Sequence, residues 1–312
     1  MRIGSANHER VLACAREWAG APMALATVIE TWRSAPCPVG THMLVHADGR
    51  FIGSVSGGCV EGDVLHIAAD VIAGAPSVLR RYGVADGAGW EVGLPCGGDI
   101  QVLVQPISET GFAAELFDRI IEARQSAQTL HVGTDLASGL SRLTEADSDA
   151  TFVNAYPPPR RLLIVGAVEI AVSLSAIAAS QGVAVTICDP RSRFLTVDRF
   201  PGIKLDNRWP DEATAVFAPD SRSAVVTLSH DPKIDDPALI AALASPAAYI
   251  AALGSKASHA ARLSRLTAAG ATVDQLGRVG GPAGVSINAI SAPEIALSIA
   301  GGMIRAFNDG LR

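Results

Sequence analysis

Residues 161–189 read RLLIVGAVEIAVSLSAIAASQGVAVTICD, and this stretch decides the fold of the second half of the chain. Residues 161–165 form a short apolar run that predicts a buried strand, residues 169–181 predict a helix, and residues 184–188 predict a second strand. Strand, helix and strand at this spacing open a doubly wound parallel sheet, and further alternation follows downstream. We therefore expect a Rossmann-like C-terminal domain.

The first half of the chain has a different order of elements and is separated from the second by prolines. Tyr156-Pro157-Pro158-Pro159 cannot continue a helix or a central strand. A chain of 312 residues is about twice the length of a common single domain. We predict two α/β domains, over residues 1–150 and 159–312. In the first we expect a helix at 6–20, strands at 24–31 and 100–105, a hairpin at 41–54 and a helix at 61–73.

Composition and charge exclude several classes of function. The formal net charge is -6 without a dense Lys or Arg cluster, which argues against nucleic acid as a partner. The sequence has no run of about 18 apolar residues and no signal-peptide pattern, so we expect no membrane association and a cytoplasmic location. The five cysteines are odd in number and include no Cys-x-x-Cys pair, which favours free thiols in a reducing compartment.

The segment Ser54-Val55-Ser56-Gly57-Gly58-Cys59-Val60-Glu61 precedes a predicted helix and has the residue types of an anion site. Adjacent glycines let backbone amides converge, the helix adds the positive end of its dipole, and the serines add hydroxyl donors. A cysteine near a helix N-terminus is a candidate thiolate for metal or sulfur. The alternative is a buried structural cysteine in a glycine turn. The candidates for binding a phosphate-bearing cofactor or a metal-oxo group are Ser56, Gly57, Gly58, Cys59 and Glu61.

The segment Gly93-Leu94-Pro95-Cys96-Gly97-Gly98-Asp99 places a second cysteine beside two glycines, before another predicted strand. Thiols in two such loops can meet, and sulfur ligands suit molybdenum or the transfer of a sulfur atom. We therefore expect Cys96, Gly97 and Gly98 to bind a cofactor, with Cys59 and Cys96 as metal ligands. The alternative is that both segments are tight turns whose cysteines only fill space.

In the second domain the candidate site is the edge at which the parallel strands end. Gly166 occupies the place of a dinucleotide-binding glycine, but Val168 stands where that fingerprint needs a second glycine, so an NAD(P) site is possible but impaired. Asp189 either meets a ribose or simply ends its strand. His230 and Ser255 follow the next two strands and are further candidates for cofactor binding. A surface histidine and a solvated helix start are the alternatives.

Seven segments carry the resemblance of this chain to a known family: residues 24–28, 34–36, 53–61, 90–98, 186–191, 228–231 and 249–256. In this order, they resemble the XdhC/CoxI family of xanthine dehydrogenase accessory proteins. The resemblance spans nearly the whole chain. Departures include Glu169, where members of the family usually have histidine, and a glycine-rich stretch at 280–288 that differs from the family pattern.

The resemblance implies a protein that binds molybdenum cofactor (molybdopterin), supports its sulfuration by a cysteine desulfurase and hands it to a client molybdoenzyme of the xanthine or aldehyde dehydrogenase type. Cys59 and Cys96 would contact the metal or its sulfur. A homodimer and a chaperone without catalytic residues of its own are also implied, and we expect the cofactor in the cleft between the two domains. The alternatives are an NAD(P)-dependent oxidoreductase using Asp189, and a scaffold that binds only the desulfurase or the client.

Overall fold

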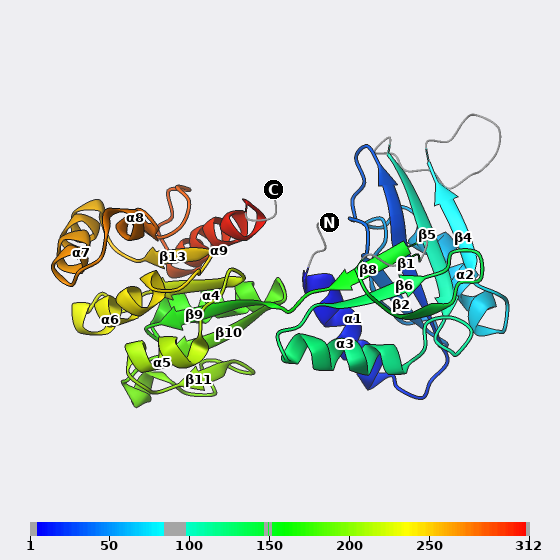
Figure 1. Cartoon of the computed structure of the whole chain (residues 1–312), viewed down its shortest axis with the longest axis horizontal. Coiled ribbons are helices and arrows are strands. Elements are labelled where there is room, and N and C mark those ends of the chain that lie inside the picture. The colour runs from blue at the N-terminus through cyan, green and yellow to red at the C-terminus, as the bar shows by residue number, and fades with distance from the viewer. Residues whose placement is uncertain (1–4, 84–97, 147–148, 150–151, 310–312) are drawn as a thin grey trace. The chain divides into compact units, whose positions relative to one another are not determined.

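The computed structural model describes residues 5–83, 98–146, 149 and 152–309. The chain divides into two compact units, Met1–Pro158 and Pro159–Arg312, whose elements are labelled in Figure 1. The first unit includes strand β8 (Phe152–Tyr156), which lies in the segment that the sequence assigned to the linker. Among the described residues, no helix combines the length and the apolar character that crossing a bilayer requires.

The N-terminal unit is built on a five-stranded antiparallel sheet. Its strands are β1 (Met23–Trp32), β2 (His42–His46), β3 (Phe51–Gly53), β4 (Val78–Tyr82) and β5 (Asp99–Pro106). They lie in the order β3-β2-β1-β5-β4. On one face, Ala24, Ala26 and Val28 pack with Val64 of helix α2 (Glu61–Ile72). The α2 helix therefore covers the face to which alternate residues of β1 point.

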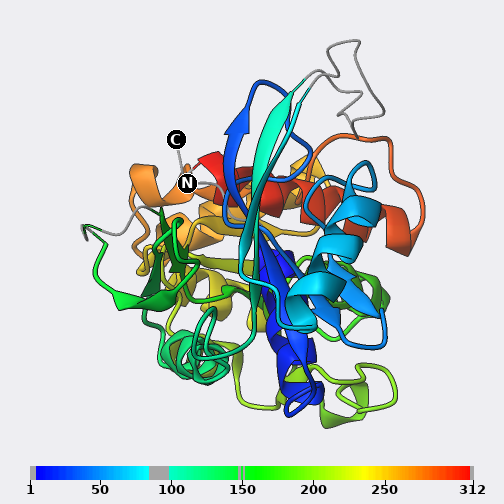
Figure 2. The same cartoon turned by 90° about the vertical axis from the view of Figure 1, so that its right-hand side faces the viewer.

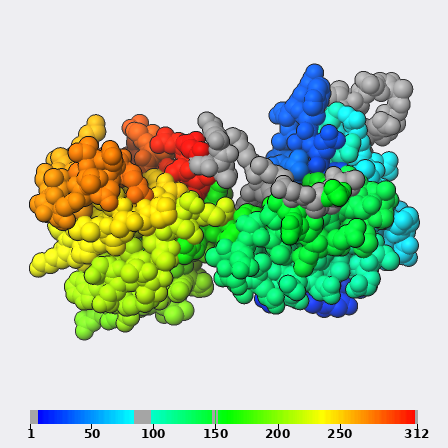
Figure 3. Space-filling model, viewed as in Figure 1, coloured from blue at the N-terminus to red at the C-terminus, as the bar shows by residue number. Residues whose placement is uncertain are grey.

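The opposite face of this sheet packs against helices α1 (Ser5–Glu17) and α3 (Glu115–Gln125) and a small second sheet. Leu25 and Leu44 enter this layer, together with Tyr156. Figure 2 shows α2 and α3 on opposite sides of the large sheet, and the green residues that include α3 form much of the visible face of this unit in Figure 3. The small sheet is antiparallel and consists of β6 (Leu130–Thr134), β7 (Ser141–Thr144) and β8, with β6 in the centre.

A β-bulge changes the direction of the last side chains of β1. The register between β1 and β5 shifts between Val28 and Glu30, so that Glu30 lies opposite Gln101 and Trp32 lies opposite Asp99. Residues directly opposite each other on antiparallel strands point to the same face, so these four side chains project from one side of the sheet. Bulges often re-aim side chains beside functional sites.

The C-terminal unit is a six-stranded parallel sheet. Its strands are β9 (Arg160–Val165), β10 (Val183–Cys188), β11 (Lys204–Asp206), β12 (Ser223–Thr227), β13 (Tyr249–Ala252) and β14 (Val279–Gly280). Their order, β11-β10-β9-β12-β13-β14, is that of dinucleotide-binding folds, which confirms the Rossmann-like prediction.

Helices cover both faces of the parallel sheet, as Figure 1 shows. Helices α4 (Glu169–Ser180) and α9 (Ala292–Asp309) pack on one face. The other face carries α5 (Pro210–Phe217), α6 (Pro232–Leu243), α7 (Lys256–Ala268) and the short α8 (Val273–Leu276). A 3-10 turn, η1 (Ser192–Phe194), follows β10.

β9 and β12 are parallel neighbours, and the strand order reverses at this point: β10 and β11 follow on one side of β9, whereas β12, β13 and β14 follow on the other. Ligands of such folds bind beyond the carboxyl ends of the strands at this point. Gly166 directly follows β9 with φ +104°, and a Cβ atom there would lie 2.7 Å from the backbone nitrogen of Ser229. Only glycine fits this close approach. The ends of the two strands are therefore in backbone contact.

Candidate functional site

The serine–glycine loop, Ser54 to Val60, wraps around the carboxylate of Glu61, the first residue of α2. The carboxylate accepts hydrogen bonds from the backbone amides of Val55 (3.0 Å), Ser56 (2.9 Å) and Gly58 (2.8 Å). It also accepts hydrogen bonds from the hydroxyls of Ser54 and Ser56. An anion does sit in the loop, and it belongs to the chain itself.

The remaining amides of the loop bind the two serine hydroxyls. Gly57 donates to Oγ of Ser54 at 2.8 Å, while Cys59 and Val60 donate to Oγ of Ser56 at 3.0 and 2.9 Å. The sequence assigned the Gly57 and Gly58 amides to the oxygens of a bound cofactor. In the folded chain these amides already have acceptors, because a carboxylate at a helix start satisfies them as a phosphate would.

Glu61 is ionised at neutral pH. Burial raises the pKa of its carboxyl group, but the hydrogen bonds from Ser54, Ser56 and the backbone lower it more, to about 2. The residue is only 8% exposed, so its charge depends on these donors rather than on water. The loop shape and the charge of Glu61 therefore support each other.

Two cysteines are associated with this loop. Cys59 and Cys37 are free, half-buried thiols that pack against the hydrophobic cluster beneath α2. Burial raises the pKa of the Cys37 thiol; Ser54 and Gly57 oppose that shift through hydrogen bonds, and the charge of Glu61 adds to it. No local pattern assigns Cys37 a role, because it stands between two prolines, far along the chain from Cys59. Its nearness to the serine–glycine loop is visible only in the fold.

The second cysteine segment is described only at its end. Cys96 and Gly97 lie outside the described residues, and their roles stay predictions. A Cβ atom on Gly98 would lie 2.4 Å from the carbonyl oxygen of Ser34, and one on Gly57 would lie 3.6 Å from Cβ of Pro36. The short stretch from Ser34 to Pro36 therefore contacts both glycine-containing segments, which lie at one end of the sheet. Within the described part of the chain, no group of three or more His, Cys, Asp or Glu side chains could hold a metal ion.

In the C-terminal unit the carboxylate of Asp189 is used inside the protein. It is fully buried, and it accepts hydrogen bonds from the amide of Ala167 at 2.8 Å and from Nε and Nη2 of Arg191 at 2.9 and 2.8 Å. Burial raises the pKa of Asp189, but these bonds outweigh burial and lower it. The group that the sequence offered to a ribose instead links the glycine turn after β9 to Arg191. This geometry gives no support to an NAD(P)-dependent oxidoreductase.

The other candidates in this unit lie at the carboxyl ends of the strands. His230 follows β12 and is exposed, with φ +63°. Ser255 follows β13 and caps α7, since its Oγ accepts a hydrogen bond from the amide of Ser258 at 3.1 Å. Gly166 contacts the residue that precedes His230. The fold thus brings Gly166 and His230 together at the point where ligands bind in related folds, and it gives Ser255 a capping role.

Comparison with known proteins identifies the family. The XdhC and CoxI family matches residues 18–83, and the XdhC Rossmann domain matches residues 162–303. An Escherichia coli protein, named molybdenum cofactor insertion chaperone PaoD, is 28% identical over 297 residues, which cover 94% of this chain and 86% of that protein. A Bacillus subtilis protein, named as a probable xanthine dehydrogenase subunit, is 26% identical over 237 residues, or 66% of this chain and 71% of that protein.

Structural comparison agrees with the sequence. A crystal structure described as a xanthine dehydrogenase from Bacillus halodurans has the same fold, with a TM-score of 0.82 at 24% identity, and the match covers 97% of this chain and 96% of that chain. The family matches fall in both halves of the chain and include the serine–glycine loop and the parallel sheet. The protein therefore belongs to the XdhC/CoxI family.

Proposed function

We propose that this protein is an accessory factor that binds molybdenum cofactor and inserts it into a client molybdoenzyme of the xanthine or aldehyde dehydrogenase type. Family membership supports the proposal, and so does the relative named a molybdenum cofactor insertion chaperone, whose match covers 94% of this chain. We propose further that a cysteine desulfurase supplies sulfur to the bound cofactor before insertion, and that the protein acts as a homodimer.

The observation that carries the proposal is the Cys59 thiol in a loop held by Glu61. The backbone amides of residues 55–60 and the hydroxyls of Ser54 and Ser56 already have hydrogen-bond partners within the protein, so the Cys59 thiol is the polar side chain of the loop that remains to bind the cofactor. Thiolates are the side chains that suit a soft metal or carry sulfur. Cys96, in the second segment, is the proposed companion ligand, and Cys37 is a further thiol beside the loop.

The test is cofactor retention by single cysteine variants. The full chain is incubated with molybdenum cofactor, separated from free cofactor by gel filtration, and analysed for bound molybdenum and pterin. We expect Cys59→Ala and Cys96→Ala to lose most of the bound molybdenum. Cys14→Ala is the matched control, because Cys14 is also a free, half-buried thiol but lies in α1, on the other side of the sheet. Equal retention in all variants would remove the thiols from the proposal.

Delivery is tested separately from binding. A client apoenzyme of the xanthine dehydrogenase type should gain activity faster from cofactor bound to this chain than from the same amount of free cofactor. Prior treatment of the loaded chain with a cysteine desulfurase and cysteine should raise the final activity. A chain that binds cofactor but slows its transfer would be a store, which contradicts the insertion role. Light scattering of the purified protein reports whether it is a dimer.

A further inference from the structure

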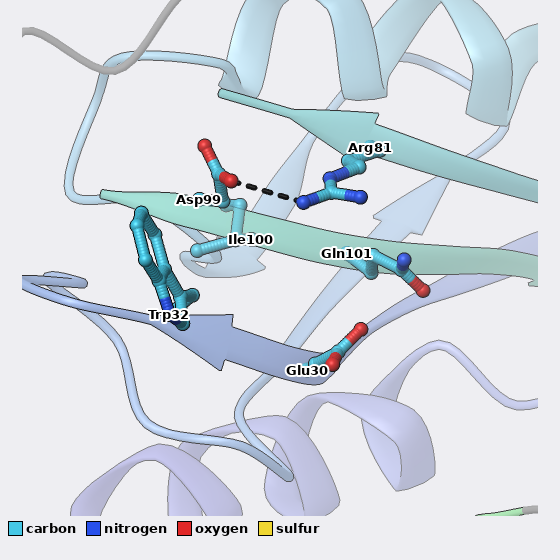
Figure 4. A pocket seen from close by; sticks show the side chains of 6 residues that line it. All are labelled: Glu30, Trp32, Arg81, Asp99, Ile100 and Gln101. Atoms are coloured by element: carbon cyan, nitrogen blue, oxygen red, sulfur yellow. Dashed lines mark hydrogen bonds and ion pairs between the residues drawn. The ribbon is translucent and has the colours of Figure 1, made fainter. Parts of the chain in front are cut away.

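A cavity of about 180 Å³ opens on the N-terminal sheet, where β1 ends and β5 begins. Its side chains come from three neighbouring strands, and most of them project from the face that α2 does not cover. The bulge in β1 is what turns two of them, Glu30 and Trp32, toward this face. Figure 4 shows the lining residues, which are Glu30, Trp32, Arg81, Asp99, Ile100 and Gln101.

Trp32 gives the cavity an exposed aromatic wall. The residue is 53% exposed, although an indole is among the most favourable side chains to bury. The guanidinium of Arg33 lies 4.0 Å from the centre of the indole ring, so one ring face is already stacked by a cation. A planar heteroaromatic ring is the kind of ligand that stacks on such a platform.

Two of the cavity's polar side chains bind each other, and two others have no side-chain partner within the described part of the chain. Nη2 of Arg81 donates to Oδ2 of Asp99 at 3.0 Å, and Figure 4 marks this contact. Within the described part of the chain, the carboxylate of Glu30 and the amide of Gln101 make no side-chain hydrogen bond or ion pair. The two lie directly opposite each other in the β1–β5 register. The two oxygens of the Glu30 carboxylate can accept hydrogen bonds, and the neighbouring Gln101 amide can donate one.

These groups match one edge of a pterin. A 2-amino-4-oxopyrimidine ring presents two adjacent N–H donors followed by a carbonyl oxygen. A carboxylate binds two such donors in a bidentate manner, and a glutamine amide can donate to the carbonyl. We propose that Glu30, Gln101 and Trp32 form a recognition site for the aminopyrimidinone ring of a pterin, with Trp32 stacking on the ring. This inference rests on the proposed function, because a pterin is the organic part of molybdenum cofactor.

The position of the cavity along the chain suits this role. Asp99 directly follows Gly98, at the end of the segment that contains Cys96. A Cβ atom on Gly98 would lie 3.0 Å from the carbonyl oxygen of Trp32, so that segment ends against the cavity wall. The proposed ring site therefore adjoins the segment to which we assign one sulfur ligand of the metal.

The test uses metal-free ligands and the full chain. Calorimetric titration with free pterin is compared with lumazine, which has a carbonyl in place of the 2-amino group, and with guanosine, which shares the same edge. We expect pterin to bind about tenfold or more tightly than lumazine, the usual effect of one lost hydrogen bond to a charged group. Guanosine binding as tightly as pterin would overturn the assignment to a pterin in favour of a nucleotide.

Variants identify the residues. Glu30→Gln should weaken pterin binding about tenfold or more and reduce the preference over lumazine, and Trp32→Leu should weaken it about tenfold through lost stacking. Trp32→Phe, which keeps a smaller aromatic wall, should retain part of the affinity. The matched controls are Glu109→Gln, on an exposed turn, and Trp209→Leu, since Trp209 is 55% exposed in the other unit. Equal losses in variants and controls would overturn the site.

The outcomes separate this inference from the proposed function. If Glu30→Gln leaves pterin binding unchanged while Cys59→Ala loses molybdenum, the ring site is wrong and the chaperone proposal stands. If the unaltered chain binds free pterin through Glu30 but retains no molybdenum from the cofactor, the ring site stands and the chaperone proposal is wrong.

Discussion

Replacing Glu61 by glutamine tests whether the serine–glycine loop is held by an internal carboxylate. The two carboxylate oxygens accept five hydrogen bonds, three of them from backbone amides. Glutamine keeps one oxygen and replaces the other by an NH2 group, which turns its hydrogens toward groups that are themselves donors. Either orientation of the amide leaves buried donors without acceptors, and such groups are costly.

The size of the effect follows from the pKa of Glu61. Burial raises this pKa, yet the hydrogen bonds from Ser54 and Ser56 bring it from 4.5 to about 2. At 1.36 kcal/mol for each pKa unit, the charged form is favoured in the fold by about 3 kcal/mol. We therefore expect Glu61→Gln to lower the free energy of unfolding of the N-terminal unit by about 3 kcal/mol at pH 7. This stabilisation is fully present above pH 4.5 and is lost as the pH falls through about 2, so the two proteins should converge only in acid.

Urea unfolding combined with hydrogen exchange of peptides from the loop and α2 measures the loss and locates it. Glu169→Gln is the matched control, because Glu169 is also the first residue of a helix after a valine N-cap, but it is exposed. The control removes only the interaction with the helix dipole, about 0.3–1 kcal/mol. Equal losses in the two variants would show that the dipole, rather than the loop, accounts for the stability.

Three further predictions concern stability. Burial lowers the pKa of His8 from 6.5 to about 4, so on acidification the unfolded chain binds a proton before the folded chain does. Between pH 7 and pH 5 this difference should lower the free energy of unfolding by about 2 kcal/mol. Acid unfolding of His8→Gln should lack this loss. Gly166→Ala forces a Cβ atom against Ser229, and the melting temperature of the C-terminal unit should fall further than with Gly202→Ala, where φ is also positive but nothing lies within 4 Å. Asp189→Asn should destabilise the same unit by about 2 kcal/mol, because it removes the charge of a buried carboxylate that holds the amide of Ala167 and the partly exposed Arg191. Urea unfolding that shows no loss would contradict that account.

The sequence predicted the C-terminal unit well, because long apolar runs and helical periods repeat there with little interruption. In the N-terminal unit the helix expected at 61–73 and the strand expected at 100–105 lie within one or two residues of α2 and β5. The small sheet was missed. Its strands are short and mixed in polarity. In addition, β8 pairs directly with β6 although β7 lies between them in the sequence, so no local pattern predicts this sheet.

The sequence predicted where anion-binding groups and carboxylates lie, but it did not predict which groups they bind. Residue types marked the loop before Glu61 as an anion site and Asp189 as a carboxylate at a strand end. Each anion–donor pair proved to be intramolecular, because a carboxylate of the chain satisfies amides as a ligand does. Cys37 carried no local signal at all, since only the antiparallel pairing brings its turn to the serine–glycine loop. The sequence shows which donors and acceptors are present at a position. Only the tertiary fold decides whether they bind each other or a ligand.

Under the proposed chaperone role, the hydrogen bonds of Glu61 have a consequence for how the cofactor binds and leaves. Because hydrogen bonds within the chain already fix the loop, we expect the loop to lose little conformational entropy when the cofactor binds. When the cofactor leaves, the amides of residues 55–60 keep their acceptors within the chain, so no unpaired backbone donors remain that would favour rebinding or misfolding. A chaperone with such a loop could bind and release its cofactor repeatedly without refolding the loop.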